Sequence, residues 1–426
     1  MTAPVASAAA ESRPALAPGR VRLALLALAL GGFGIGATEF VAMGLLPEIA
    51  RELLPTAYAA SREDALAQTG WMISAYAAGV VVGAPTIAAF AARFPRRRLL
   101  LALALAFTLG TAASALAPTF ELVVVARFVA ALPHGAYFGV AALVAASMMG
   151  PGNRGRGVAL VLSGLTIANV VGVPLITLLG QVAGWRIAYL AVAAIFAATF
   201  VAILALVPSQ PGDPHATVRR ELAVFRRIGV WFALLTGAIG FGGFFAVYSY
   251  VSPLSTEVTG LPASWVPFAL VAAGLGMTVG NLIGGRLADS GASRAIFVCF
   301  GAFAASLVLL ILTASTAPGL FAGLFLVGAS AAALSPVIQT RLMDVAGESQ
   351  TLAAAINHSA LNIGNSLGAY LGGVVIAAGW GFLAPSWVGV ALCVPGVLFA
   401  LGGVLVSRRW LTETGSIRRP AMPPTG

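Results

Sequence analysis

The sequence places one carboxyl group where a carboxylate is costly. Glu39 lies inside an almost unbroken apolar run from Leu23 to Leu46, in the segment Gly31–Pro47. A helix of about 20 apolar residues crosses the ~30 Å hydrocarbon core of a bilayer. An ionised carboxylate there costs roughly 2.5–3.5 kcal/mol, so we interpret Glu39 as a functional acid that takes up a proton. The structural alternative is a side chain that reaches the membrane surface or is satisfied by a neighbour.

A later apolar run, at 121–149, carries two more ionisable residues. Arginine within a span usually faces the bundle interior and pairs with a carboxylate, a carbonyl or water. We expect Arg127 to tune Glu39, directly or through water, because a cation favours the charged carboxylate while desolvation favours the neutral acid. His134 lies two helical turns further on and is a candidate proton relay. The alternatives are an arginine near the outer interface, which Glu121 marks, and a histidine that only bonds a carbonyl.

The run at about 352–377 has a polar face. His358, Asn362 and Asn365 recur at i, i+4 and i+7 and therefore share one side of a helix. Lipid offers these groups no partners, so the face should line a cavity or bind another helix. Tyr76 and Tyr248 could stack on an aromatic substrate, and ordinary packing or a belt of aromatic residues at the membrane interface would explain them equally well. The candidate cavity residues are Thr38, Tyr76, Asn169, Tyr248, Asn281, Gln339, His358, Asn362 and Asn365.

Composition identifies a membrane protein. Of 426 residues, 59% are hydrophobic and 9% charged, whereas soluble domains carry about 25% charged residues. The net charge of +10 comes from arginines in short loops, and the sequence has no lysine. This distribution indicates membrane topology and not nucleic-acid binding. Two cysteines within apolar runs imply neither a disulfide nor a metal site. Without P-loop, HExxH or GxSxG motifs, we predict no enzyme activity and no cofactor.

Twelve apolar runs divide about one basic, Pro-containing segment, six on each side. This predicts an all-α integral membrane protein. The remaining runs lie at about 68–92, 99–117, 157–181, 186–207, 229–252, 264–288, 295–315, 318–340 and 384–407. The predicted parts are a disordered cytoplasmic tail at 1–22, six-helix bundles at 23–207 and 229–407, a cytoplasmic linker at 208–228 and a cytoplasmic tail at 408–426.

The arginines orient these helices. They gather in alternate loops, in the linker and at both termini, whereas the other loops hold only Arg51, Arg62 and Arg186. Cytoplasmic loops carry the excess of Lys and Arg, so both termini and the linker should be cytoplasmic.

The two halves repeat in sequence. Gly79-x3-Gly83 followed by Arg97 reappears 197 residues later as Gly276-x3-Gly280 followed by Arg294. Ile-x-Asn-x2-Gly at 167–172 reappears at 363–368, an offset of 196. Two separate segments that repeat at almost the same offset indicate that one half of the chain is a duplicate of the other. Parallel six-helix repeats are a transporter architecture with the ligand site at the midplane between them.

These residues also resemble a known family, the major facilitator superfamily, and within it the twelve-span drug:proton antiporters. GATEFVAMGLLPEIA at 36–50 is similar to the signature of that branch, with Glu39 at its membrane acid. Arg127 with LPHGAYFG at 132–139 resembles the segment linked to proton coupling. Gly172, Pro174 and Gly180 resemble the Gly/Pro motif of exporters. Residues 184–186, Gly-Trp-Arg, are similar to the bacterial arabinose-efflux and chloramphenicol-exporter group.

One departure concerns the loop between spans two and three. The family motif usually carries an acid where this chain has Ala92, whereas the second copy, GGRLADSG at 284–291, keeps Asp289. A latch that depends on the first acid is therefore in doubt. The resemblance assigns conformational roles to Arg93, Arg97, Gly172, Pro174, Gly180, Gly285, Asp289 and Arg294.

The resemblance implies a proton-coupled secondary transporter that exports drug-like or amphipathic molecules across a bacterial-type plasma (inner) membrane. Its expected partners are protons, a small-molecule substrate and the lipid bilayer, with no nucleic acid, and we expect a monomer driven by the proton gradient. The alternatives are a sugar or metabolite exporter of the same fold, or a membrane receptor that senses a ligand without transporting it.

Overall fold

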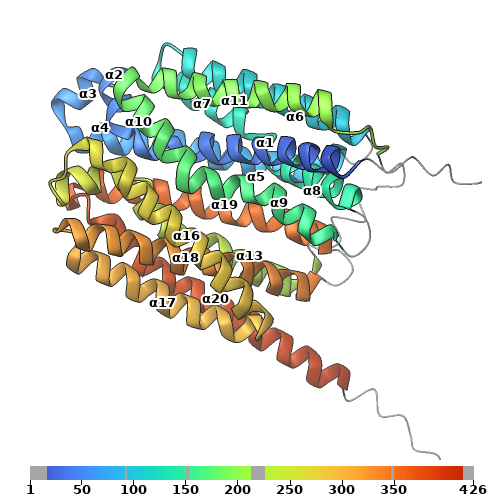
Figure 1. Cartoon of the computed structure of the whole chain (residues 1–426). Helices are drawn as coiled ribbons and strands as arrows, with labels where there is room; N and C mark the ends of the chain where they lie inside the picture. Colours follow the sequence, from blue (N-terminus) through green and yellow to red (C-terminus); the bar gives the residue numbers. More distant parts are fainter. Residues whose placement is uncertain (1–16, 92–93, 150–152, 213–225, 347–349, 416–426) are drawn as a thin grey trace, which may run out of the picture.

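The computed structural model describes residues 17–91, 94–149, 153–212, 226–346 and 350–415. The described residues form helices and no strand, and they contain twelve helical segments long and apolar enough to span a membrane. Figure 1 shows these helices lying roughly side by side, in two layers. The short helices α2–α4 lie at one end of the bundle, called here the α3 end, and the start of α1 and the end of α20 lie toward the other.

The first layer contains the helices before residue 207. Its elements are α1 (Pro18–Gly44), α2 (Leu46–Leu53), α3 (Pro55–Ala60), α4 (Arg62–Thr69), α5 (Trp71–Ala91), α6 (Arg96–Leu116), α7 (Phe120–Ala131), α8 (His134–Met149), α9 (Arg154–Ile167), the π-helical turn η1 (Ala168–Gly172), α10 (Val173–Ala183) and α11 (Trp185–Leu206).

The second layer contains the helices after the linker. Its elements are α13 (Ile228–Gly240), α14 (Gly242–Tyr248), α15 (Val251–Pro253), the π-helical turn η3 (Leu254–Val258), the 3₁₀ turn η4 (Ala263–Trp265), α16 (Val266–Asp289), α17 (Ala292–Thr313), α18 (Ala317–Ala346), α19 (Gln350–Val375), the π-helical turn η5 (Ile376–Trp380) and α20 (Ala384–Gly415).

The predicted runs match these helices closely, with two differences at the chain ends. Helix α1 begins at Pro18, so residues 18–22, predicted as part of a disordered tail, are helical. Proline fits the first turn of a helix because its missing N–H has no partner there. Helix α20 continues to Gly415, past the predicted end of the last bundle at residue 407.

Proline breaks the fourth span. The sequence predicts one helix at 121–149, but the chain turns at Leu132 and Pro133 between α7 and α8. Proline removes a backbone donor and clashes with the preceding turn. His134 therefore begins α8, on the other side of this kink from Arg127 but within the same 30-residue span. The fifth span also deviates, through η1, just before Pro174.

Glycine packing reproduces the sequence repeat in space. A Cβ on Gly79 would collide with the carbonyl of Phe128, and one on Gly276 with the carbonyl of Phe325. Both pairs are 49 residues apart (128 − 79 and 325 − 276). The backbones of α5 and α7, and of α16 and α18, can approach this closely only because glycine has no side chain. The predicted duplication is therefore visible as equivalent helix contacts.

The largest apolar cluster crosses the seam between the two layers. It joins Phe40 of α1, and Leu45 just past the end of that helix, with Phe245 of α14 and Leu270 of α16. A second cluster lies within the first layer and includes Phe107, Tyr137 and Phe196. Cys299 and Cys393 are buried and unpaired, as predicted.

Candidate functional site

Glu39 lies in the interior of the bundle, where its carboxylate links the two layers. Its side chain is 6% exposed, and its Oε1 accepts a hydrogen bond of 3.2 Å from Nδ2 of Asn365 on α19. The flanking residue Phe40 stacks on Phe245 and meets Tyr248 edge-on across the same seam. The alternative of a carboxylate that reaches the surface is therefore wrong.

Arg127 is fully buried beside the same helix. Its Nη1 donates to Oγ1 of Thr38 at 3.0 Å. Its guanidinium lies over the ring of Tyr76, 4.2 Å from the centroid, and 5.4 Å from that of Tyr189. Such stacking stabilises a cation where water is scarce. Arg127 faces the bundle interior, so the alternative of an arginine at the outer interface is wrong.

Glu39 and Arg127 do not form a contact pair. Within the described ranges, the ion pairs closer than 4.0 Å are Arg62–Glu257 and Arg186–Glu52. Nε and Nη2 of Arg127 have no hydrogen-bond partner. A buried charged group usually satisfies its donors. Arg127 therefore keeps donors for a further acceptor, and its one side-chain hydrogen bond goes to Thr38, which precedes Glu39 in the chain.

Tyr76 joins Arg127 to His134. The tyrosine hydroxyl and Nδ1 of His134 lie 3.3 Å apart, while the Tyr76 ring carries the Arg127 guanidinium. His134 in turn contacts Phe138, and Phe138 stacks on His358 of the second layer at 5.8 Å between centroids. Both histidines therefore belong to one aromatic chain that leads from the arginine across the seam.

The polar face of α19 is buried at the seam. Asn365 reaches Glu39, and Asn362 uses its Nδ2 within α19, on the carbonyl of His358. The Oδ1 atoms of both asparagines have no partner, nor does that of Asn169 in η1. Asn169 and Asn365 are equivalent in the repeat, and each lies where its own helix meets the opposite layer. The hydroxyl of Tyr248 is also buried without a partner.

Two predicted cavity residues lie apart from this cluster. Asn281 of α16 is exposed, and Gln339 of α18 is half-buried without a hydrogen bond to any member of the cluster among the described residues. Sequence spacing did not separate them from Asn169 and Asn365, because an amide within an apolar run gives the same signal whichever way its helix is turned. We no longer assign Asn281 to the site.

The glycine and proline motif of the fifth span packs that span against α1. A Cβ on Gly172 would collide with the ring of Phe33, and one on Gly180 with the side chain of Leu45. Pro174 is buried in the first turn of α10. These residues therefore allow close approach of two helices that both contact the seam.

The arginine motifs between spans behave differently in the two halves. Arg97 donates to the carbonyl of Leu204 on α11, within its own half. Arg93 lies outside the described residues. Asp289 and Arg294 are exposed, and neither belongs to an ion pair in the described part of the chain. Gly285 has open space where a side chain would stand.

Several residues at the seam had no sequence signal. Tyr189 is fully buried over Arg127 with its hydroxyl unpartnered, and it looks like any apolar-run tyrosine in the sequence. Ser74 and Ser366 exchange hydrogen bonds, each hydroxyl donating to the other's carbonyl at 3.2 and 3.3 Å. Gln181 donates to the carbonyl of Ala263 at 2.9 Å. Together with Arg62–Glu257, these contacts close the seam toward the α3 end.

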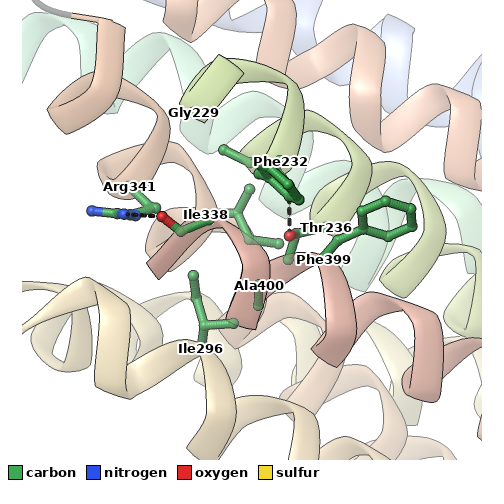
Figure 2. A pocket seen from close by; sticks show the side chains of 10 residues that line it. Gly229, Phe232, Thr236, Ile296, Ile338, Arg341, Phe399 and Ala400 are labelled. Carbon is green, nitrogen blue, oxygen red and sulfur yellow. Dashed lines mark hydrogen bonds between the residues drawn. The ribbon is translucent and has the colours of Figure 1, made fainter. Parts of the chain in front are cut away.

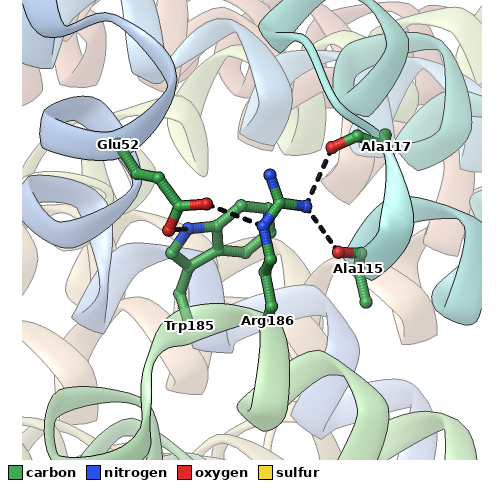
Figure 3. A network of polar contacts seen from close by, with 5 residues as sticks. All are labelled: Glu52, Ala115, Ala117, Trp185 and Arg186. Carbon is green, nitrogen blue, oxygen red and sulfur yellow. Dashed lines mark hydrogen bonds and ion pairs between the residues drawn. The ribbon is translucent and has the colours of Figure 1, made fainter.

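A second arginine–glutamate region holds the corner of the first layer. Figure 3 shows Glu52 of α2 accepting from Nε1 of Trp185 and from Nε of Arg186, both at 2.7 Å. Nη1 of Arg186 donates to the carbonyls of Ala115, in the last turn of α6, and Ala117, just past its end, at 2.6 and 2.8 Å. Gly184, with φ of +95°, allows the turn that begins α11.

Figure 2 shows a narrow crevice among α13, α17, α18 and α20. Its lining is mostly apolar, with Phe232, Ile296, Ile338 and Phe399, and Nη2 of Arg341 donates to the carbonyl of Gly403 at 3.1 Å. The crevice holds about 10 Å³, no more than a single water molecule needs. It is a packing gap and not a ligand site.

Comparison with known proteins agrees with this architecture. The sequence model of the Major Facilitator Superfamily matches residues 28–290 and 266–423. The chain is 38% identical to the inner membrane transport protein YdhP of Escherichia coli K12 over 85% of this chain and 91% of that protein. It is 32% identical to a chloramphenicol resistance protein of Streptomyces lividans over 89% and 95%.

A solved structure shares the fold. A bacterial homologue of the human lysosomal transporter Spinster, in an inward-facing and unoccupied conformation, superposes with a TM-score of 0.68. It is 16% identical and covers 96% of this chain and 100% of its own.

Proposed function

The chain belongs to the major facilitator superfamily, a family of membrane transporters, and from that premise we propose that it is a proton-coupled exporter of small molecules. The observation that carries the proposal is the hydrogen bond between Glu39 of the first layer and Asn365 of the second. One titratable carboxylate thereby contacts both moving parts of an alternating-access transporter.

Protonation of Glu39 would change the contact between the layers. A hydrogen bond to a carboxylate is roughly twice as strong as one between neutral groups. With Glu39 ionised, Nδ2 of Asn365 holds the second layer to the first at 3.2 Å. With Glu39 protonated, this bond weakens and the layers separate more readily. Proton uptake and the change of access then share one residue.

Arg127 supplies the opposite effect. Its unpartnered Nε and Nη2 favour an anionic or acceptor group nearby, so they resist protonation of Glu39. Substrate that binds these donors would remove that influence and change the affinity of Glu39 for its proton. Tyr76 and His134 continue from Arg127 toward Phe138 and are the proposed relay for the released proton.

The closed seam supports an assignment of the two access states. The contacts of Ser74, Gln181 and Arg62 join the layers toward the α3 end. By the arginine distribution this end faces outward, with both termini in the cytoplasm of a cell whose plasma membrane holds the protein. The described structure then corresponds to the state that receives substrate from the cytoplasm.

The proton gradient would be the only energy source, without a cofactor. Entry of one proton supplies about 2.3 kcal/mol per 100 mV of membrane potential, in addition to any pH gradient. We propose that one chain suffices, since both bundles and the seam between them come from the same polypeptide. Its partners are then the bilayer, protons and the small-molecule substrate.

A sugar or metabolite exporter is the second candidate. The unpartnered Oδ1 atoms of Asn169, Asn362 and Asn365 are acceptors that suit hydroxyl groups. The aromatic cluster of Phe40, Phe245 and Tyr248 instead suits an apolar, ring-bearing compound. A substrate panel therefore separates the two candidates.

The test is pH-gradient dissipation in energised inverted vesicles on addition of antibiotics, dyes and sugars. We expect a compound-specific fall in the gradient that Glu39→Gln abolishes, because the amide cannot carry the proton. Glu121→Gln is the matched control, since Glu121 is an exposed acid at the start of α7.

Undiminished proton-dependent export by Glu39→Gln would contradict the proposal. Ligand binding by correctly inserted protein without any flux would instead favour a receptor.

A further inference from the structure

A groove of about 310 Å³ opens along the seam at the α3 end, away from Glu39. One wall is α4 and the start of α5, with Asp64, Gln68 and Trp71, and the other is α19 with η5, including Tyr370 and Val374. This volume lies within the range of small-molecule sites, about 300–1,000 Å³. The proposed transport mechanism uses none of these side chains.

The first wall presents three different groups in one line. Asp64, Gln68 and Trp71 are spaced i, i+4 and i+7 along α4 and α5, which run almost continuously because Gly70 keeps right-handed helical angles. Trp71 is 52% exposed and meets Tyr370 edge-on at 5.3 Å between centroids. Two aromatic rings from opposite layers therefore stand together at the groove.

The charge of the groove is negative. Asp64 is exposed and belongs to no ion pair within 4.0 Å in the described ranges, whereas the neighbouring Arg62 is held by Glu257 at 2.8 Å. Among the described residues, no arginine or histidine lines the groove. Asp64 also stands in the first turn of α4, where an acid favours the helix dipole, but this role explains neither the aromatic pair nor the cavity.

The floor separates the groove from the central site. Ser74 lies at its inner side and is bound to the carbonyl of Ser366. Gly70 and Gly373 approach the hydroxyl of Tyr250 so closely that a Cβ on either would collide with it. An occupant of the groove therefore remains at the rim of the closed seam.

We propose that this groove binds an amphipathic organic cation. Trp and Tyr faces attract a desolvated cation through their negative ring faces, the Asp64 carboxylate supplies the opposite charge, and the small residues below admit an apolar body. An occupant touches both layers at once. It holds the seam shut at this end, so the groove inhibits transport when it is filled and does not carry the transported substrate.

The test measures binding of radiolabelled tetraphenylphosphonium to the purified full-length protein. We expect saturable binding that Trp71→Ala weakens about tenfold and Asp64→Asn about fivefold. Trp71→Ala should keep proton-coupled export that depends on Glu39, so failure of cation binding and failure of the proposed function are distinguishable.

Matched controls are Trp387→Ala and Glu121→Gln, because both residues are exposed and lie outside the groove. Trp71→Phe keeps an aromatic ring and should retain most of the binding, which separates loss of the ring from a folding defect. Absence of saturable binding, equal loss in the control variants, or unchanged binding in Trp71→Ala would each overturn the proposal.

Discussion

Two regions of the first layer contain one glutamate, one arginine and a nearby aromatic ring, yet they are built differently. At the corner, Arg186 bonds Glu52 and two carbonyls and stacks on Trp185 at 4.4 Å. At the centre, Arg127 makes one hydrogen bond to a side chain, and Glu39 bonds the opposite layer instead. The corner ties helices within one layer, whereas the centre leaves charge available between layers.

The difference suggests which interactions hold the fold and which respond to a proton. The groups of the Arg186–Glu52 pair already have hydrogen-bond partners, so we expect this pair to stay intact during a transport cycle. A buried arginine with two unpartnered nitrogens costs stability, because each buried unsatisfied donor costs about 1–3 kcal/mol. Such a cost is common at functional sites and is offset by packing elsewhere.

Replacing Arg127 or Arg186 by glutamine, one at a time, should give the largest difference between the two regions in export and in melting temperature. Arg127→Gln should lower proton-driven export about 10- to 100-fold, the equivalent of losing one charged hydrogen bond, with little change in melting temperature. Arg186→Gln should lower the melting temperature by a few degrees, since about 2 kcal/mol of partly exposed contacts is lost. Vesicle transport normalised to inserted protein, with thermal unfolding in detergent, measures both.

The reverse pattern, with transport lost in Arg186→Gln and retained in Arg127→Gln, would mean that the two regions have been assigned the wrong roles.

Removal of the bond between layers should have an intermediate effect. Asn365→Ala takes away the donor to Glu39, and we expect export to fall about tenfold while substrate binding persists. Asn357→Ala is the matched control, because Asn357 is a buried asparagine on the same helix whose side chain makes no hydrogen bond to Glu39. Equal loss in both variants would point to general damage to α19.

Replacing Glu48 should have the smallest effect. It tests whether burial of a carboxylate matters when that carboxylate does not join the two layers. Glu48 lies one turn before Glu52 on α2, outside the spans, with Oε2 buried and unpartnered. Burial raises the pKa of Glu48, and its own backbone N–H, Arg51 and Arg62 lower it by less. The folded protein therefore holds this proton more tightly than the unfolded chain, and the resulting stability disappears as pH rises through the folded pKa.

Glu48→Gln should accordingly raise the melting temperature by about 1 °C at neutral pH and leave it unchanged under acid conditions, with normal export. Thermal unfolding across pH checks this sign. A coupling defect in Glu48→Gln would show that a buried carboxylate need not bridge the layers to matter.

Much of the fold could be predicted from the sequence, because apolar length and arginine placement directly report membrane spans. The twelve spans, the repeat and the burial of Glu39 and Arg127 agree with the structure. The helix break at Pro133 was missed because apolar composition continues through it. Periodicity assigns residues to helix faces, but it does not say which faces meet.

For this reason the sequence did not show that Asn365, and not Asn281, lies at the site. It also did not show which partners Glu39 and Glu52 bind. The bond between Glu39 and Asn365 joins positions more than 300 residues apart, and no local pattern encodes it. The same holds for Tyr189 of α11, whose position beside Arg127 of α7 depends on how the helices of the first layer pack together.

The most direct test of the central claim is the distance between the layers as a function of pH. Spin labels at Ala60→Cys and Ser264→Cys, both exposed at the α3 end on opposite layers, would report it after Cys299 and Cys393 are replaced by alanine. If protonation of Glu39 controls the seam, double electron–electron resonance should show two distances between the labels. The relative populations of these two distances should change with pH, and Glu39→Gln should remove that change. A pH response that persists unchanged in Glu39→Gln would contradict the claim.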